Sequence, residues 1–600
     1  MTIRKMFSNT DPRTEYLRRI DERRAKSTQQ FQRFRKIGFI RLAFLAVGLI
    51  LLGFVVFAGL SAWWLVFPAV VFVGLGRVQS RITEIRSRCE RAARLYEQGL
   101  ARLDNRWAGT GATGNRFDDP AHPYADDLDL FGQGSLFELL SIARTDTGEE
   151  TLARWLLTPA GIDVVRARQE AVTELRPKLD LREDLALLGE GVPSGESARG
   201  LSTWVNGPYW NIATWIRPTA IVISLITIAT LVLWFAGFSP IPFVLVLIVR
   251  QVILYRLRVP VQRVIGEVDG PGNNLSLLSD ILKRLEQERY TSARLIELRA
   301  ALDVGGSPPS KQIARLNRLV ELLDSRRNFI FAPLAAILLW PLQCAISIER
   351  WRQQSGPAVG HWLDAVGELE ALNSLSSYAY EHPHDPFPEV IASNAHFEAV
   401  GIGHPLIPEQ RNVRADLSLG DEPAVFIVSG SNMSGKSTLM RTVGVNVVLA
   451  LAGAPVRAVS LRLSPLQVGA SIRIQDSLQA GASRFYAEIK RLRQVVELTN
   501  GDRPVLFLLD EILHGTNSHD RQIGGERVVH GLIDRGAIGL ITTHDLALAR
   551  IADDLGPRAA NVHFEDHLED GQMRFDYRLR PGVVQHSNAL ELMRSVGLDV

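Results

Sequence analysis

Residues 430–438 read Gly430-Ser-Asn-Met-Ser-Gly-Lys-Ser-Thr438, and this stretch decides the fold of the C-terminal third of the chain. It matches the phosphate-loop pattern G-x-x-x-x-G-K-[ST] and lies between the apolar run 424–429, a predicted strand, and a predicted helix. Glycines turn backbone N–H groups toward phosphates, a lysine reaches the β and γ oxygens, and a hydroxyl completes a Mg²⁺ shell. The pattern predicts an ATP site built from Gly430, Gly435, Lys436, Ser437 and Thr438, with Ser437 also a Mg²⁺ ligand.

Two further apolar runs predict strands that end in polar side chains. The run 505–509 leads into Asp510 and Glu511, and the run 538–543 leads into His544. Asp510 is placed to hold Mg²⁺ and Glu511 to polarise the attacking water, whereas His544 can contact a γ-phosphate. The alternative for Asp510 and Glu511 is a solvated acidic end of a buried strand, and the alternative for His544 is an ordinary loop histidine. Because an open parallel sheet brings its strand ends to one crevice, we expect these side chains to converge on the phosphate loop.

These motifs together resemble the MutS-type ATPases of the ABC superclass over residues 400–600. The pair Asn432-Met433 is similar to the signature inside that family's loop, so the resemblance implies that Asn432 binds nucleotide. The run 510–516 is similar to the family's Asp-Glu-Ile-Gly-Arg-Gly-Thr segment, with Leu513-His514 replacing Gly-Arg. Thr542-Thr543-His544 resembles its switch histidine. The resemblance implies catalytic roles for Glu511 and His544.

The segment 476–485 resembles the family segment whose serine reaches the γ-phosphate of the opposite subunit. Carried onto this chain, Ser483 acts in trans and the competent ATPase is a homodimer with two nucleotides between its subunits. Such a dimer closes on ATP and opens after hydrolysis. An N-cap role for Ser483 is compatible with this, because 485–498 has the pattern of an amphipathic helix.

Residues 128–205 and 259–381 show helical periods without strand patterning. Ser135 is a natural N-cap for a helix predicted over 136–144, and a second helix is predicted after Thr147-Gly148 through Leu157. The stretch 135–159 resembles the beginning of the family's helical core and lever domain. A generic helical bundle is the alternative.

The N-terminal third departs from that family because of two long uncharged apolar runs, 42–76 and 218–249. One membrane-spanning helix needs roughly 20 apolar residues, so each run is long enough for a hairpin. Breaks are predicted at 59–61 and 237–240, where glycine and proline end helices. Buried core helices are one alternative for both runs, and a re-entrant or interfacial hairpin is another, because the second span of each pair is the shorter. A third apolar stretch, 329–348, is predicted to be core.

Charge predicts the topology of these hairpins. Arginines and lysines flank both runs on their outer sides, which indicates that the termini and the ATPase domain lie in the cytoplasm and that the chain is a multi-pass protein of the cytoplasmic membrane. Membrane lipids are then partners. The two cysteines, Cys89 and Cys344, are too few for a disulfide framework. A net charge of +2 gives no general signature of nucleic-acid binding.

The predicted fold class is multidomain, with helical transmembrane hairpins, an all-α core and lever domain, and a C-terminal α/β P-loop ATPase domain. The predicted regions are a basic tail (1–36), a first hairpin (37–78), a linker helix and loop (79–127), the first core and lever segment (128–205), a second hairpin (206–258), the second core and lever segment (259–384) and the ATPase domain (385–600).

The predicted function is a membrane-anchored, dimeric MutS-like ATPase that binds DNA in connection with mismatch repair. The mismatch readers of the family carry an N-terminal Phe-x-Glu element, and none lies in the N-terminal region here; Phe387-Pro388-Glu389 has the letters but directly precedes the ATPase domain. The alternative is therefore a membrane ATPase that acts on protein or lipid partners. A transporter is disfavoured because the apolar runs hold no ionisable residues.

Overall fold

The computed structural model describes residues 11–188, 197–269, 275–302, 307–329, 331–431, 434–473, 484–513, 516–544, 549–569 and 572–584. These residues form two compact units. Unit 1 comprises residues 1–111 and 179–187, and unit 2 comprises residues 112–178 and 188–600.

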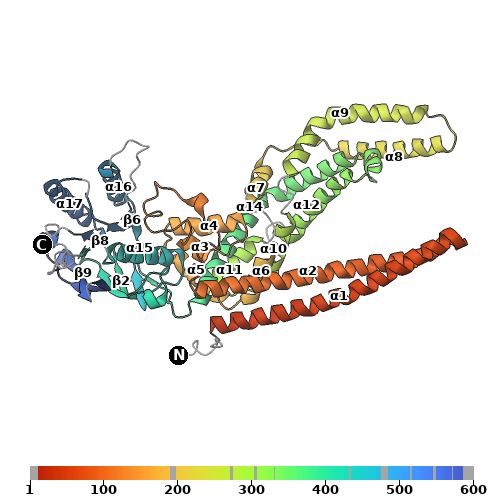
Figure 1. Ribbon diagram of the computed structural model, residues 1–600. Coiled ribbons are helices and arrows are strands. Elements are labelled where there is room, and N and C mark those ends of the chain that lie inside the picture. The colour runs from red at the N-terminus through yellow and green to blue at the C-terminus, as the bar shows by residue number, and fades with distance from the viewer. Residues whose placement is uncertain are drawn as a thin grey trace. The chain divides into compact units, whose positions relative to one another are not determined.

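Unit 1 is a long antiparallel helical hairpin with one short helix at its base (Figure 1). Its elements are α1 (Pro12–Ala58), the 3₁₀ turn η2 (Ala62–Leu65), α2 (Val66–Leu103) and α6 (Leu179–Leu188). Asp11 caps α1 by accepting from Thr14 N, and Pro12 suits the first turn because it needs no N–H partner there. The predicted break is confirmed, since α1 ends at Gly59 in the left-handed conformation. The predicted boundary at residue 36 falls inside α1, so the basic segment and the apolar segment share one helix.

The base of this hairpin is held together by polar contacts, in contrast to its apolar end. Glu183 of α6 accepts from Tyr96 Oη at 2.7 Å and pairs with Arg23 at 2.9 Å. Tyr16 packs against Gly99, where an added Cβ would lie 2.5 Å from the tyrosine ring. From residue 42 to the end of α1, through η2 and along α2 as far as residue 76, the side chains are uncharged and largely exposed, with Phe57 at 90% and Trp63 at 81%. An exposed apolar surface of this kind marks an interaction site, with a membrane or with another protein.

Unit 2 begins with a helical region, as predicted. Its helices are α3 (Leu136–Leu140), α4 (Asp146–Leu157), α5 (Ile162–Leu175), α7 (Ser197–Asn206), α8 (Ile216–Phe235), α9 (Ile241–Asp269), α10 (Leu275–Gln287), α11 (Ala293–Leu302), α12 (Pro309–Asp324), α13 (Ala332–Ile337) and α14 (Trp340–Glu381).

Two helix bounds correct the sequence-based prediction. The helix predicted over 136–144 ends at Leu140, and Ser141 is extended because Ile142 N turns away to donate to Ser374 Oγ of α14. The next helix begins at Asp146 rather than after Gly148, since Thr145 is its N-cap and accepts from Gly148 N. Ser135 caps α3 as predicted, accepting from Glu138 N.

The second half of the stretch 329–348 is core, as predicted, whereas the first half is not, because Phe329 is 92% exposed and Leu334 47% exposed. The stretch contributes α13 and the first turns of α14, and Leu342, Ala345 and Ile346 are fully buried. Leu342 and Ile346 form a cluster with the first turns of α8. This packing fixes the root of the α8–α9 hairpin on α14.

The α8–α9 hairpin projects from that root (Figure 1). The second predicted break is also confirmed, since α8 ends at Phe235 and α9 begins at Ile241. Among the described residues, three helical stretches are long and apolar enough to cross a membrane by length and composition: 12–58, 62–103 and 216–235.

The C-terminal region of unit 2 is α/β and contains two sheets. A four-stranded sheet has the order β1-β5-β2-β3, and a six-stranded sheet has the order β10-β9-β4-β8-β7-β6. All neighbours in the larger sheet are parallel except the edge pair β9–β10, so the sheet is mixed rather than purely parallel. The strands are β1 (Glu389–Val390), β2 (Phe397–Ile402), β3 (Ala415–Leu419), β4 (Val425–Ser429), β5 (Ser460–Leu463), β6 (Gln467–Ser471), β7 (Val505–Leu509), β8 (Ile538–Thr543), β9 (Ala559–Glu569) and β10 (Gln572–Pro581).

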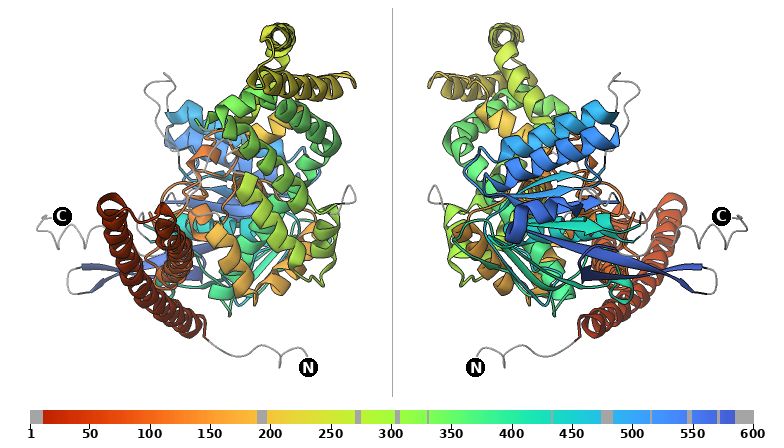
Figure 2. Two further views of the ribbon diagram at one scale, coloured as in Figure 1. Left: turned by 90° about the vertical axis from the view of Figure 1, so that its right-hand side faces the viewer. Right: turned by 90° about the vertical axis from the view of Figure 1, so that its left-hand side faces the viewer.

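Helices cover both faces of the larger sheet. They are α15 (Lys436–Ala452), α16 (Arg484–Leu498), α17 (Ser518–Ile533) and the short α19 (Ile551–Leu555). Helices α16 and α17 lie side by side on one face, and α15 lies on the other (Figures 1 and 2). The strand order explains this, because the chain crosses from β4 to β6 in one direction and returns through β7 to β8, and right-handed crossovers then fall on opposite faces.

Candidate functional site

The loop after β4 passes directly into α15, as the sequence predicts. Gly430 and Gly435 have φ angles of 151° and 100°, which favour glycine. A Cβ at Gly430 would lie 2.7 Å from Ser434 Oγ, so the tight turn requires a residue without a side chain. Helix α15 begins at Lys436 directly after this loop, and a helix N-terminus suits an anionic group.

Lys436 lies inside this loop. Its Nζ donates to Gly430 O at 2.7 Å and to Ser431 O at 3.0 Å, and its side chain is 4% exposed. Burial lowers the pKa of Lys436, and the nearby carboxylates of Glu511 and Asp510 oppose that shift. The ammonium is thus held at the loop with little water around it, where its charge acts strongly on an anion.

Asp510 lies at the end of β7 and joins the loop to the neighbouring strand. Ser437 Oγ donates to Asp510 Oδ2 at 2.5 Å, and Thr542 of β8 donates to Asp510 Oδ1. A hydroxyl and a carboxylate at this distance are hard oxygen donors, the type that Mg²⁺ prefers when substrate phosphates and water complete its shell. The two predicted metal ligands are therefore brought together.

Glu511 lies next to this pair. Its Oε1 is 3.8 Å from Lys436 Nζ and 3.3 Å from His544 Nδ1. Its backbone N–H donates to Thr542 Oγ1 at 3.1 Å. The carboxylate thus stands between the buried ammonium and the histidine at the ends of three parallel strands, as the sequence predicts.

The backbone after Glu511 has an unusual conformation. Glu511 and Leu513 have φ angles of 48° and 57°, values rare for residues with a side chain. Leu513 N donates to the carboxylate of Glu488, a buried residue of α16. This buried carboxylate supports the turn that presents the Glu511 side chain.

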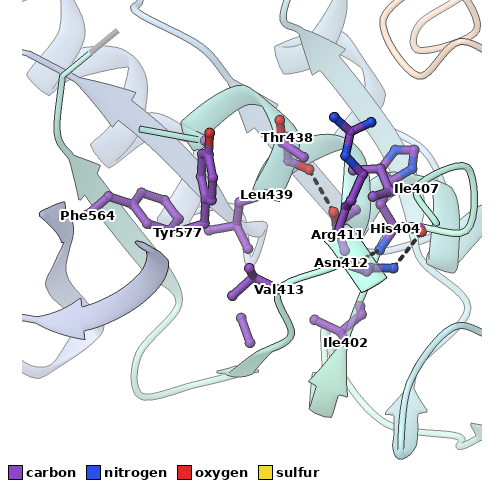
Figure 3. A pocket seen from close by; sticks show the side chains of 13 residues that line it. Ile402, His404, Ile407, Arg411, Asn412, Val413, Thr438, Leu439, Phe564 and Tyr577 are labelled. Carbon is purple, nitrogen blue, oxygen red and sulfur yellow. Dashed lines mark hydrogen bonds between the residues drawn. The ribbon is translucent and has the colours of Figure 1, made fainter. Parts of the chain in front are cut away.

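A pocket of about 310 Å³ opens beside the loop (Figure 3). Tyr577 and Phe564 stand on one side, Leu439 and Val413 on its floor, and Arg411 with His404 on the other side. Gly435 and Thr438 also line it, so the pocket continues from the phosphate loop. Burial lowers the pKa of His404 to about 4, which keeps its ring neutral at physiological pH.

Two predicted site residues lie outside the described part of the chain. The site also contains residues that the sequence did not predict. Asn432 and Ser483 lie outside the described residues, as do His514 and most of the segment 476–485. Thr542 stood in the switch-histidine motif but was given no role of its own, and Glu488 was not predicted as a member of the site because a glutamate in an amphipathic helix carries no local signal.

The segment predicted as a linker also contributes to the site. Asp127 is 1% exposed and accepts from the backbone of Ile472 and Arg473, which follow β6, each at 2.7 Å. It also pairs with Arg491 of α16 at 2.7 Å. Within unit 2, Asp127 therefore bonds the segment before α3 to the end of β6 and to α16, so this part of the chain is not a free linker.

The comparison with known families agrees with this architecture. The family model described as MutS domain V matches residues 426–599, which include the loop, the strand ends and the described portion of the pocket wall formed by β9 and β10. Residues 426–599 of the chain are therefore a MutS domain V. This domain contains Lys436, Asp510, Glu511, Thr542 and His544.

Individual relatives are similar over the same region of the chain. The DNA mismatch repair protein MutS 2 of Halobacterium salinarum is 34% identical over 242 residues, which are 39% of this chain and 27% of the relative. Endonuclease MutS2 of Thermus thermophilus is 31% identical over 258 residues (42% and 32%), and the DNA mismatch repair protein MSH6 of Arabidopsis thaliana is 30% identical over 272 residues (42% and 20%). The chain thus spans a third or less of the length of these relatives.

Proposed function

We propose that this chain is a membrane-anchored ATPase that binds ATP with Mg²⁺ and works as a homodimeric switch. The observation that carries the proposal is the convergence of Lys436, Ser437, Asp510, Glu511 and His544 at the ends of β4, β7 and β8. Ligands of open α/β sheets bind at such strand ends, and the residue types match those needed for phosphoryl transfer.

Each residue has a distinct role in hydrolysis. The loop backbone and Lys436 would hold the β- and γ-phosphates, and Ser437 with Asp510 would hold Mg²⁺, which would supply positive charge against the charge that develops on the phosphates. Glu511 orients the attacking water and accepts its proton. His544 lies within 3.3 Å of Glu511 and is suited to contact the γ-phosphate while keeping that carboxylate in position.

The pocket beside the loop fits the base of the nucleotide. It adjoins Gly435 and Thr438 at the phosphate end and offers an aromatic face, Tyr577, together with the apolar side chains of Leu439 and Val413. A planar base stacks on such a face. Thr438 lies where the pocket meets the loop, in agreement with its predicted contact with the nucleotide.

Dimerisation, DNA binding and membrane anchoring complete the proposal. Ser483 reaches the γ-phosphate of the opposite subunit, so ATP joins the two ATPase domains and hydrolysis releases them. DNA is the proposed partner because three relatives are MutS 2, MutS2 and MSH6, two of them named as DNA mismatch repair proteins. The two apolar hairpins anchor the chain in the cytoplasmic membrane with the ATPase domain in the cytoplasm, and their exposed apolar side chains support this placement.

Two substitutions test the ATPase activity. Lys436→Ala removes the buried ammonium, so we expect loss of ATP binding. Glu511→Gln keeps the shape and leaves Lys436, Ser437 and Asp510 intact, so we expect ATP binding without turnover. The measurements are equilibrium ATP affinity and single-turnover hydrolysis. Wild-type turnover by Glu511→Gln would remove the role assigned to that carboxylate.

The partner and the anchor need separate experiments. Binding of duplex DNA to the detergent-solubilised protein, measured between about 50 and 200 mM salt, should weaken steeply if phosphate contacts dominate. No salt-sensitive binding would favour the alternative, a membrane ATPase that acts on protein or lipid partners. For the anchor, membranes are washed at alkaline pH and then treated with protease from the outer side. Release into the wash would show that the apolar segments are not inserted, and cleavage of the ATPase domain would show inverted topology.

A further inference from the structure

The α8–α9 hairpin has a root that packs on the protein along one face and a short apolar end without such packing. On α8, Ile216, Ala220 and Ile223 pack against Leu339, Leu342 and Ile346 of the α14 region. One turn further on, Ser224 and Thr227 are also buried. The opposite face of these turns is exposed, with Val222 at 52% and Leu225 at 60%, and beyond Thr227 most side chains are exposed, as Val232 (60%) and Phe235 (82%) illustrate.

The returning helix becomes polar at a similar distance from the tip. Helix α9 begins at Ile241, and its first charged residue is Arg250, followed by the exposed Gln251. At ~1.5 Å per residue, Arg250 lies only about 14 Å along α9 from its first residue. Counting from the turn at 236–240, the antiparallel pairing brings Arg250 to about the height of Thr227 on α8.

A full crossing does not fit this pattern. The hydrocarbon core of a bilayer is about 30 Å thick, and the free end of the hairpin reaches roughly half of that. A full crossing would put Arg250 and Gln251 near the middle of the bilayer, in a turn of α9 whose neighbouring Val249 and Val252 are exposed. A charged side chain there is strongly unfavourable.

The α1–α2 hairpin of unit 1 has different proportions. From Leu42 to Ala58 α1 is apolar without a charge, which amounts to about 25 Å of helix. Its turn carries two exposed tryptophans, Trp63 and Trp64, the side chain typical of a membrane–water interface. These dimensions match one complete crossing and return.

A second feature lies at the root of the α8–α9 hairpin. Helix α13 contacts α8, and beside it Phe329 is 92% exposed and Leu334 47% exposed. Arg326 and Arg327 precede these apolar residues. An apolar surface next to arginines suits the boundary between headgroups and acyl chains.

We propose that the two hairpins enter the membrane to different depths: α1–α2 crosses the bilayer, whereas α8–α9 dips into the acyl chains of one leaflet and stops with Arg250 at the phospholipid headgroups. This rests on the proposed membrane anchoring and adds the depth and the side of insertion. The cytoplasmic leaflet is the one entered, because the root of the hairpin belongs to the same unit as the ATPase domain.

Single cysteines in the full-length chain test the depth. Cys89 and Cys344, both buried, are replaced by alanine, and ATP binding checks the background. Into it are placed Ser61→Cys at the turn of the first hairpin, Ser239→Cys at the turn of the second, and Gln251→Cys beside Arg250. A membrane-impermeant maleimide is applied to intact spheroplasts and, separately, to inverted membrane vesicles. A lipid with a quencher in the middle of the bilayer reports depth for a fluorophore at Ser239→Cys.

We expect labelling of Ser61→Cys from the outside only, labelling of Gln251→Cys from the ATPase side only, and no impermeant labelling of Ser239→Cys from either side, with strong quenching by the mid-bilayer lipid. Labelling of Ser239→Cys from the outside would show a complete crossing and overturn the proposal. Its labelling in the inverted vesicles would show that the hairpin is not inserted and would also overturn it. Ser61→Cys reports separately on anchoring: if it is labelled only from the ATPase side, the proposed transmembrane anchor itself fails.

Discussion

Replacing Thr542 by valine tests whether the hydrogen bonds seen at the strand ends position the catalytic carboxylates. The fully buried hydroxyl donates to Asp510 Oδ1 and accepts from Glu511 N at 3.1 Å. A hydrogen bond to a charged group contributes about 1.5–3 kcal/mol and one between neutral groups about 0.5–1.5 kcal/mol. The two together therefore set an upper limit of about 4.5 kcal/mol for what the valine variant can lose.

Only part of the lost hydrogen-bond energy raises the activation barrier of hydrolysis. At 1.36 kcal/mol for each tenfold change in rate, a share of about 1.5–3 kcal/mol predicts a fall in kcat of roughly 10- to 150-fold. The hydroxyl is committed to Asp510 and Glu511, and valine keeps the volume of threonine, so we expect ATP affinity to change by less than about threefold.

The assay is single-turnover hydrolysis at saturating ATP, together with equilibrium binding of the nucleotide. Thr542→Ser is the matched control because it keeps the hydroxyl and loses only a methyl group. Wild-type turnover by Thr542→Val would refute the positioning role. Equal losses in the serine and valine variants would assign the effect to packing instead.

Three other regions of the chain give further predictions. Glu349 and Arg352 form a fully buried ion pair at 3.3 Å. Arg352→Leu leaves the Glu349 charge unpaired and should lower the free energy of unfolding in denaturant by about 3–5 kcal/mol, and adding Glu349→Gln should restore much of this loss. Equal stability of the single and double variants would contradict this prediction. Burial raises the pKa of Glu370 from 4.5 to about 7, so its neutral form is favoured on folding and stability should fall as pH rises from about 4.5 to about 7. The Glu370→Gln variant lacks this contribution, and parallel thermal unfolding profiles of the two proteins would disprove it. Mixing Lys436→Ala chains with Ser483→Ala chains should restore one intact composite site per mixed dimer, measured as recovered hydrolysis, and none in verified mixed dimers would leave Ser483 as a helix cap only.

The sequence by itself determined the local elements of the ATPase domain and the breaks in the hairpins. Strands at 425–429, 505–509 and 538–543 follow from short apolar runs, and the loop between β4 and α15 follows from its glycines and lysine. Gly59 ends α1 because a glycine adopts the left-handed conformation without strain. In each case the information lies within a few neighbouring residues, which is why pattern and residue type suffice.

Contacts between distant segments were decided only by the tertiary structure. Asp510 meets Thr542 because β7 and β8 pair in the register Leu509↔Ile541, and no periodicity in either strand specifies that register. No local pattern specifies the contact of Glu488 with the turn after Glu511 or that of Tyr577 with Gly435. Asp127 was predicted to belong to a linker, and its buried hydrogen bonds to the residues after β6 were likewise decided by the tertiary structure. A short helix such as α3 ends early for a related reason, because a hydrogen bond to α14 outweighs its own weak preference to continue. Local chemistry thus specifies the loop and the strand ends, whereas strand register and long-range packing bring the carboxylates, the hydroxyl and the base pocket to one place.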